Sequence, residues 1–198
     1  MSEKIALIFD TETSGFMKKD LDAFEPEQAW SVQLAWVLAS KTKVYHQFEC
    51  LIKMAPERTI NYHAEQIHGI SKAETDLFGI DESLICSFFK ESLSRCDILV
   101  AHNMDFDFSF LNNTIIRSAD LELMTMIGNV EKFCTMKEST NICAIPKARG
   151  TGYKWPKLTE LYQRLFGSEC RQTHTALDDV LLTALCFFGL EEKGYVNW

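Results

Sequence analysis

The sequence has no apolar run of membrane-spanning length, and its N-terminus has none of the features of a secretory signal peptide. The short apolar stretch at residues 5–9 is followed at once by acidic residues, which is typical of a buried strand. Low-complexity tracts, internal repeats and interdomain linkers are also missing, and 198 residues suit one domain. We therefore expect a single domain over residues 1–198, in a cytoplasmic protein.

Positive charge is in short supply, because 20 Lys and Arg stand against 28 Asp and Glu and give a net charge of −8. Broad electrostatic binding to duplex nucleic acid needs a basic surface, so this balance argues against it. A small pocket that grips one strand end is still compatible, since bound divalent cations could supply the missing positive charge.

The cysteines lack the pattern of a disulfide scaffold or a zinc site. Their number is odd and no two have CxxC spacing, since they stand at positions 50, 86, 96, 134, 143, 170 and 186. We expect reduced thiols, mostly buried as core fillers, in an intracellular protein.

Apolar residues make up 46% of the chain, which is enough for a sizeable core. Their pattern predicts strands at residues 5–9, 30–39, 43–53 and 97–101, the second and third joined as a hairpin. Helices are expected near residues 81–95, 104–119, 157–166 and 175–192, and loops at residues 17–28 and 146–156. A hairpin followed by strand–helix alternation predicts an α/β fold in which helices cover a mixed sheet.

Two acidic residues, Asp10 and Glu12, follow the first apolar run at positions i and i+2. Alternation along a strand puts both side chains on one face, where two anions repel unless a cation lies between them. Metal binding by oxygen ligands would explain the pair. Taken alone, the pair fits equally well with two solvated acids beyond the end of a strand.

A second acidic segment, residues 101–111, follows a predicted strand and opens a predicted helix. Helical spacing puts Asp107 on the apolar stripe, whereas Asp105 lies in a more polar row and suits the positive end of the helix dipole. An acid on an apolar stripe needs a compensating partner, so we interpret Asp107 as the functional one. Local capping of the helix would explain Asn103 and could explain His102.

A third segment, residues 173–180, opens the last predicted helix. Thr175 is a good N-cap residue, and Asp178 three positions later makes the acidic version of a capping box. Asp178 therefore has a structural explanation, and Asp179 is mildly favoured as a functional residue. His174 precedes the helix, and an isolated histidine is more often inert surface.

The three segments together are a stronger indication of a site than each one alone, because each lies at a strand end or a helix start. In an α/β sheet such positions gather on one side. Four carboxylates gathered there would make a site for two Mg²⁺ or Mn²⁺ ions, which lie roughly 3.5–4 Å apart in such sites. The four are Asp10, Glu12, Asp107 and Asp179.

The same segments resemble the motifs of the DEDDh exonucleases, the DnaQ-like family of the proofreading ε subunit of bacterial DNA polymerase III. Asp-x-Glu-Thr-x-Gly is met at residues 10–15, His-Asn-x-x-Phe-Asp at residues 102–107, and His-x-Ala-x-x-Asp at residues 174–179. Ile67-His68-Gly69-Ile70 resembles the segment that lines the 3′-terminal nucleotide. The motifs occur in the family's order and span nearly the whole chain.

The resemblance implies a ribonuclease H-like fold, with antiparallel N-terminal strands followed by parallel ones, and two divalent ions, Mg²⁺ or Mn²⁺. Asp10 would bridge both ions, Glu12 and Asp179 would complete the shell of the first, and Asp107 would act mainly through water. His174 would be the general base, because a histidine pKa near ~6.5 suits proton transfer at neutral pH.

The resemblance also implies contacts to the terminal nucleotide. Phe16 stands where the family has an apolar wedge against the last base, with core packing of its loop as the alternative. The backbone of Thr13 would hold the 3′ hydroxyl. The complete set of expected substrate contacts is Thr11, Thr13, Phe16, Ile67, His68, His102, Asn103 and Phe106.

Two further features are open to more than one interpretation. The most evident basic cluster could guide the phosphate backbone, or could equally be a solvated loop; it comprises Lys147, Arg149, Lys154 and Lys157. The insertion at residues 17–28 departs from the tightest family members and could reshape the way into the site. The sequence shows no polymerase domain, so a role in a replicase stays open.

Together these features predict one exonuclease domain, residues 1–198, that removes nucleoside 5′-monophosphates from single-stranded or frayed DNA 3′ ends, in end trimming or proofreading. A DNA polymerase is a candidate partner. The main alternative is an RNA-trimming enzyme of the RNase T or oligoribonuclease type, because no feature reports contact to a 2′-OH. A phosphodiesterase for small nucleotides could use the same site. A non-cutting module that holds strand ends would be expected to lack a carboxylate or the histidine, and all five are present.

Overall fold

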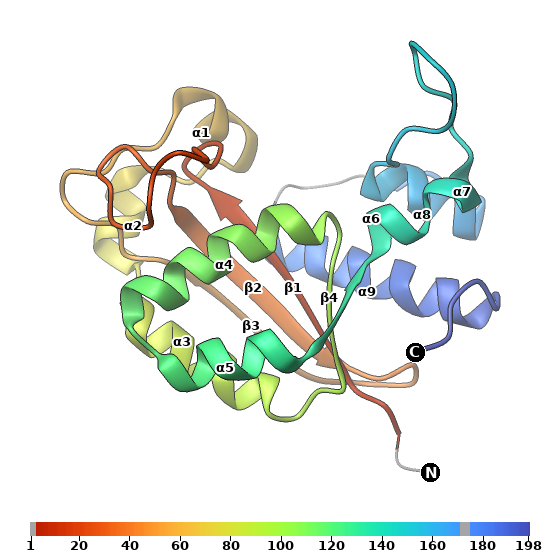
Figure 1. Ribbon diagram of the computed structural model, residues 1–198, viewed down its shortest axis with the longest axis horizontal. Coiled ribbons are helices and arrows are strands. Elements are labelled where there is room, and N and C mark those ends of the chain that lie inside the picture. Colours follow the sequence, from red (N-terminus) through yellow and green to blue (C-terminus); the bar gives the residue numbers. More distant parts are fainter. Residues whose placement is uncertain (1–2, 171–174) are drawn as a thin grey trace.

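The computed structural model describes residues 3–170 and 175–198. These residues form a five-stranded sheet with the strand order β3-β2-β1-β4-β5 (Figure 1). The strands are β1 (Ala6–Thr13), β2 (Ser31–Ala39), β3 (Val44–Leu51), β4 (Ile98–Ala101) and β5 (Glu131–Cys134). The pairs β1–β2 and β2–β3 are antiparallel, whereas β1–β4 and β4–β5 are parallel. The predicted mixed sheet is therefore confirmed.

Helices cover both faces of the sheet (Figure 1). One face packs against α3 (Glu82–Leu93), α4 (Met104–Ser118) and α5 (Leu121–Asn129), and the other against α9 (Ala176–Glu192), with α8 (Leu158–Phe166) on α9. The shorter helices are α1 (Tyr62–His68), α2 (Lys72–Phe78), α6 (Thr135–Glu138) and α7 (Thr140–Cys143). Among the described helices, none is both long and apolar enough to cross a membrane.

The central strand β1 sends alternate side chains to the two faces of the sheet. Leu7 and Phe9 belong to the core beneath α3 and α4, whereas Ala6 and Ile8 pack against α9. The strand is longer than the sequence predicted, because β2 pairs with it as far as Thr13. The two acids therefore lie within the strand, and the alternative that they are solvated residues beyond its end is wrong.

Several elements were missed because they are short or charged. β5 has only four residues, and its first two, Glu131 and Lys132, are exposed at the edge of the sheet. The predicted helix near residue 81 does begin there, but the Asp81 side chain makes no cap hydrogen bond.

All seven cysteines lie in the described residues and are free thiols, four of them buried.

The loop after β1 is anchored by the buried Trp30. Ser14 and Trp30 exchange two hydrogen bonds of 2.8 Å, one through the Ser14 amide and one through its hydroxyl. The guanidinium groups of Arg117 and Arg58 lie 3.5 Å and 4.3 Å from the centre of the indole ring. Arg117 also donates from Nε to both carboxylate oxygens of Glu82 at 3.0 Å. These contacts fix the position of the chain where it leaves β1, the strand that carries Asp10 and Glu12.

The buried Arg117–Glu82 pair generates a stability prediction. We expect Glu82→Gln to lower the free energy of unfolding by about 3 kcal/mol, because it leaves a buried guanidinium without its counter-charge. The double variant Glu82→Leu/Arg117→Met should lose less, since neither charge then remains. Urea unfolding followed by circular dichroism measures both. The control is Glu91→Gln, which breaks an exposed ion pair to Arg95 and should cost under about 1 kcal/mol; an equal loss in Glu82→Gln would contradict the prediction.

Candidate active site

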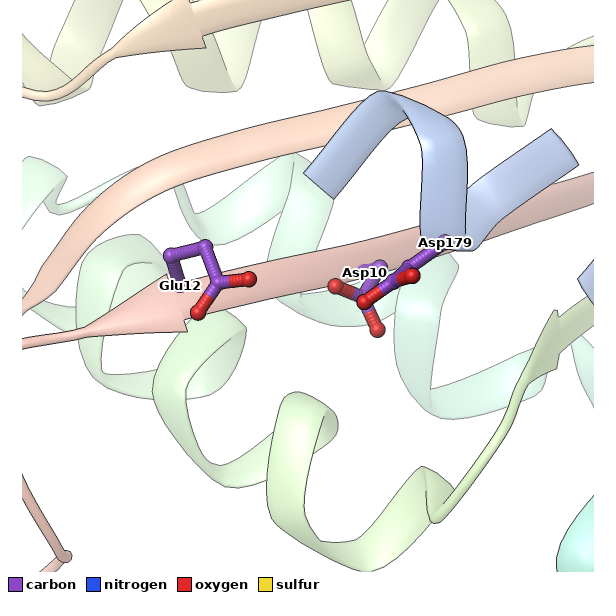
Figure 2. Close-up of side chains that lie close together, drawn as sticks. All are labelled: Asp10, Glu12 and Asp179. Atoms are coloured by element: carbon purple, nitrogen blue, oxygen red, sulfur yellow. The ribbon is translucent and has the colours of Figure 1, made fainter. Parts of the chain in front are cut away.

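Three carboxylates converge on the α9 face of the sheet. Asp10 and Glu12 come from β1 and Asp179 from the first turn of α9, and one oxygen of each lies within 4.8 Å of the others. Figure 2 shows the carboxyl groups of Asp10 and Asp179 side by side, with Glu12 farther along the strand. A set of close carboxylate oxygens is the donor set that hard divalent cations prefer, so these residues fit a metal ion.

Asp107 approaches the same strand from the opposite face. Its carboxylate is 3% exposed and accepts from the Thr11 amide at 3.1 Å and from the Thr11 hydroxyl at 2.8 Å. β4 pairs with β1 only as far as Ile8. Beyond that point the Asp107 carboxylate accepts the hydrogen bond from the Thr11 amide that a neighbouring strand would otherwise accept. It is not one of the three closest carboxylates, but its charge acts on Asp10 and Glu12, so the four-carboxylate site stays a prediction. Asp105, which helical spacing had separated from it, is exposed and forms an ion pair with Lys137.

The cluster is electrostatically unfavourable without a cation. Burial, followed by the charges of Asp107, Asp179 and Glu12, raises the pKa of Asp10 well above its usual range. Burial and the charges of Asp179 and Asp107 raise the pKa of Glu12 to about 8. Burial also raises the pKa of Asp107 to about 7, although the hydrogen bonds from Thr11 oppose this. A cation that binds near neutral pH would therefore displace protons from these groups.

A groove of about 430 Å³ lies beside the cluster and includes the Glu12 side of it. Phe16 is 86% exposed at its rim and makes an edge-to-face contact with Phe106, with ring centroids 6.4 Å apart. The alternative that Phe16 packs into the core is therefore wrong. The groove is lined by Thr11, Glu12, Thr13, Gly15, Phe16, Asn61, His63, Ala64, Ile67, His68 and Phe106.

The far wall of the groove is α1, a helix that was not predicted from the sequence. Its signals are nevertheless in the sequence: Asn61 caps its start by accepting from the His63 amide at 2.9 Å, and Gly69 ends it with φ of 75°. Asn61 and His63 are therefore groove residues that were missed, and the Asn…Gly spacing could have revealed them.

His68 joins α1 to the end of β1. Its Nδ1 accepts from the Ile70 amide at 3.0 Å, so Nε2 carries the proton and donates to the Thr13 carbonyl at 3.2 Å. Burial lowers the pKa of His68, which favours this neutral form. The carbonyl of Thr13 is thus already engaged, and His68 positions the strand end as well as lining the groove.

His102 and Asn103 do not line the groove. The Pro156 carbonyl can only accept, so His102 donates to it from Nε2 at 3.2 Å, while Nδ1 accepts from the Thr135 hydroxyl at 2.9 Å. Burial lowers the pKa of His102 to about 4. Asn103 stands at the N-cap of α4 with φ of 76° but makes no side-chain cap hydrogen bond, so its expected capping role is wrong. Substrate contacts by these two residues stay predictions.

The third motif is only partly described by the structure. Thr175 is the N-cap of α9, as predicted, and accepts from the Asp178 amide at 3.4 Å. Asp179 faces the cluster from the next position. His174 lies outside the described residues, so its role as general base stays a prediction.

The raised pKa of Glu12 predicts a pH-dependent stability. In the metal-free protein the folded state holds a proton on Glu12 that the unfolded state releases near 4.5, so stability falls as pH rises from about 4.5 to about 8. We expect Glu12→Gln to raise the metal-free Tm at pH 8.5 by about 3 °C, and to change it less at pH 5. Calorimetry with EDTA measures this. Asp105→Asn, at an exposed acid, is the control, and a pH-independent gain would contradict the prediction.

Comparisons with known proteins place the chain in a family. A family model described as exonuclease (RNase_T) matches residues 7–187, a range that contains all three motifs. Together with the Asp-Glu-Asp cluster, this match indicates that the protein uses a divalent metal. Among curated protein sequences, none matches the chain.

Solved structures show the same fold. Escherichia coli Exonuclease I in complex with a dA16 oligonucleotide has a TM-score of 0.75 at 16% identity, and Exonuclease I from Methylocaldum szegediense has a TM-score of 0.71 at 16% identity. In both cases the similarity covers 96% of this chain and 41% of the other, so this chain spans less than half the length of these structures. The expected ribonuclease H-like fold and resemblance to DnaQ-like 3′→5′ exonucleases are confirmed, and the chain belongs to the exonuclease family.

Proposed function

We propose that this chain is a single exonuclease domain that removes nucleotides from the 3′ ends of single-stranded DNA with the help of two divalent cations, Mg²⁺ or Mn²⁺. The observation that carries the proposal is the convergence of three carboxylates, one buried and two half-buried, beside a groove with an exposed aromatic rim. The similar Exonuclease I structures hold dA16 and dT13 oligonucleotides, which supports single-stranded DNA as the substrate. End trimming and proofreading beside a polymerase would use the same chemistry.

The residues of the chain have separate tasks in this proposal. When bound, the cations supply positive charge that stabilises the charge growing on phosphate and leaving oxygen. Asp10, Glu12 and Asp179 hold them, and Asp107, fixed by Thr11, orients water at the edge of the cluster. His174 takes a proton from the attacking water. The water oxygen bonds to phosphorus, the bond to the 3′ oxygen of the preceding nucleotide breaks, and a nucleoside 5′-monophosphate leaves.

The groove explains the preference for a single strand end. Its volume of about 430 Å³ lies in the range of small-molecule sites and is suited to one nucleotide. Phe16 projects at the rim, where a terminal base can stack on it whatever its sequence. A net charge of −8 disfavours extended contact with duplex backbones. The chain therefore binds the end of a single strand and has little basic surface to bind a duplex.

Digestion of 5′-labelled single-stranded oligomers tests the proposal. With Mg²⁺ we expect a ladder of shortened products and free nucleoside 5′-monophosphate, and with EDTA we expect neither. Asp107→Asn should slow the reaction about 100-fold, the scale seen when a metal site loses a supporting group. His174→Ala should slow it by about 10²–10⁴-fold through loss of the general base. Gel electrophoresis and chromatography of the mononucleotide give the rates.

Asp105→Asn is the matched control, because Asp105 lies in the same helical turn as Asp107 but is exposed. Its rate should stay within about twofold of the wild-type rate, as expected for a surface change. Products from internal cleavage, or activity that survives EDTA, would overturn the proposed function. Faster digestion of a matched RNA oligomer would replace DNA by RNA as the substrate.

A further inference from the structure

The segment between α7 and α8, which the sequence predicts as a loop, forms a short hairpin. Pro146 and Tyr153 form an antiparallel bridge, and the amides of Lys147 and Lys154 donate to the carbonyls of Gly152 and Ile145 at 3.1 Å and 2.9 Å. In Figure 1 this hairpin, drawn in teal and blue, projects from the body of the molecule. A projecting hairpin with fixed backbone pairing can present side chains at a defined place.

The base of the hairpin is hydrogen-bonded to the residue that follows β4, near the carboxylates. Pro156 accepts the hydrogen bond from His102, which directly follows β4 and stands five positions before Asp107. Trp155, the residue before this anchor, is 61% exposed, and Tyr153 is 44% exposed. Because the neighbouring backbone is fixed by this hydrogen bond and the indole ring is exposed, the ring is available to bind a ligand.

The hairpin and the nucleotide groove lie on opposite sides of the carboxylates. The strand order puts β2 and β3 on one side of β1, with the groove helix α1 following β3, and puts β4 and β5 on the other, with the hairpin after β5. Figure 1 shows α1 and the hairpin on opposite sides of the end of β1. A strand with its last base in the groove and its last phosphodiester at the carboxylates would continue toward the hairpin.

The hairpin region also carries exposed positive charge in an acidic chain. Lys154 is neutralised by Glu160 at 2.6 Å. Lys147, Arg149 and Lys157 are exposed and form no ion pair within residues 3–170 and 175–198. Aromatic side chains beside unpaired basic residues are the combination by which proteins bind single-stranded nucleic acid without sequence preference.

We propose that Trp155 is a stacking platform for a base upstream of the scissile phosphate, with the hairpin's basic residues along the adjoining backbone. This second subsite rests on the proposed function and extends it from one nucleotide to several. It binds a nucleobase by its face, so it tolerates any sequence. Its ligand is single-stranded DNA long enough to reach from the groove, across the carboxylates, to the hairpin.

The test compares a long and a minimal substrate. We expect Trp155→Ala to raise the KM for a dT12 oligomer about 10-fold, in line with the loss of one base–aromatic stack. Hydrolysis of thymidine 5′-(4-nitrophenyl phosphate), which has no upstream base, should stay within twofold. Trp155→Phe keeps an aromatic face and should restore most of the dT12 affinity. Tyr195→Ala, at an exposed aromatic near the C-terminus, is the control and should change neither substrate.

Direct binding separates this proposal from the proposed function. Titration of dT12 should quench tryptophan fluorescence in the wild-type protein, and Trp155→Phe should remove most of the quenching. Fluorescence quenching reports DNA binding even if neither substrate is hydrolysed. Absence of hydrolysis would overturn the catalytic function and would leave the stacking platform testable by binding. Equal losses on both substrates, unchanged dT12 affinity in Trp155→Ala, or unchanged quenching in Trp155→Phe would overturn the platform. Thermal melting confirms that each variant is folded.

Discussion

Mutual repulsion among closely spaced carboxylates is the constraint on which the rest of the structure depends. Asp10, Glu12 and Asp179 are held within a few ångströms of one another, although burial and their neighbours' charges disfavour ionisation of the two β1 acids. Apolar packing of β1 against α9 on one face and against α4 on the other is what opposes this repulsion. The fold therefore gives up some stability to keep anionic ligands preorganised for a cation.

The parts of the structure that depend on local pattern could be predicted from the sequence. The hairpin strands, the later parallel strand and the helices that begin near Met104 and Ala176 follow from apolar periodicity and capping residues. The same periodicity separated Asp107, which is buried, from Asp105, which is exposed. Burial of an acid on an apolar stripe is a local property, so one sequence is sufficient to detect it.

The parts that depend on distant pairing could not be predicted. β1 continues to Thr13 because β2 pairs with it, and no residue near Thr13 reports that pairing. The Thr11–Asp107 hydrogen bonds join residues 96 positions apart, and His102 is held by partners 33 and 54 positions away. The Asp107 carboxylate is placed in the same way, because Thr11 holds it from the other face of β1, and its charge nevertheless acts on Asp10 and Glu12. Such contacts arise only when the sheet and its helices assemble.

The alternation of β1 has a consequence for how this protein can diverge. Odd-numbered residues 7 to 11 face α4 and even-numbered residues 6 to 12 face α9, so one strand supplies both halves of the site. Insertion or deletion of a single residue before Asp10 would exchange the two rows and bury the acids among apolar side chains. The strand therefore has little tolerance for changes of chain length, whereas a surface connection such as residues 17–28 can change in length without exchanging the two rows.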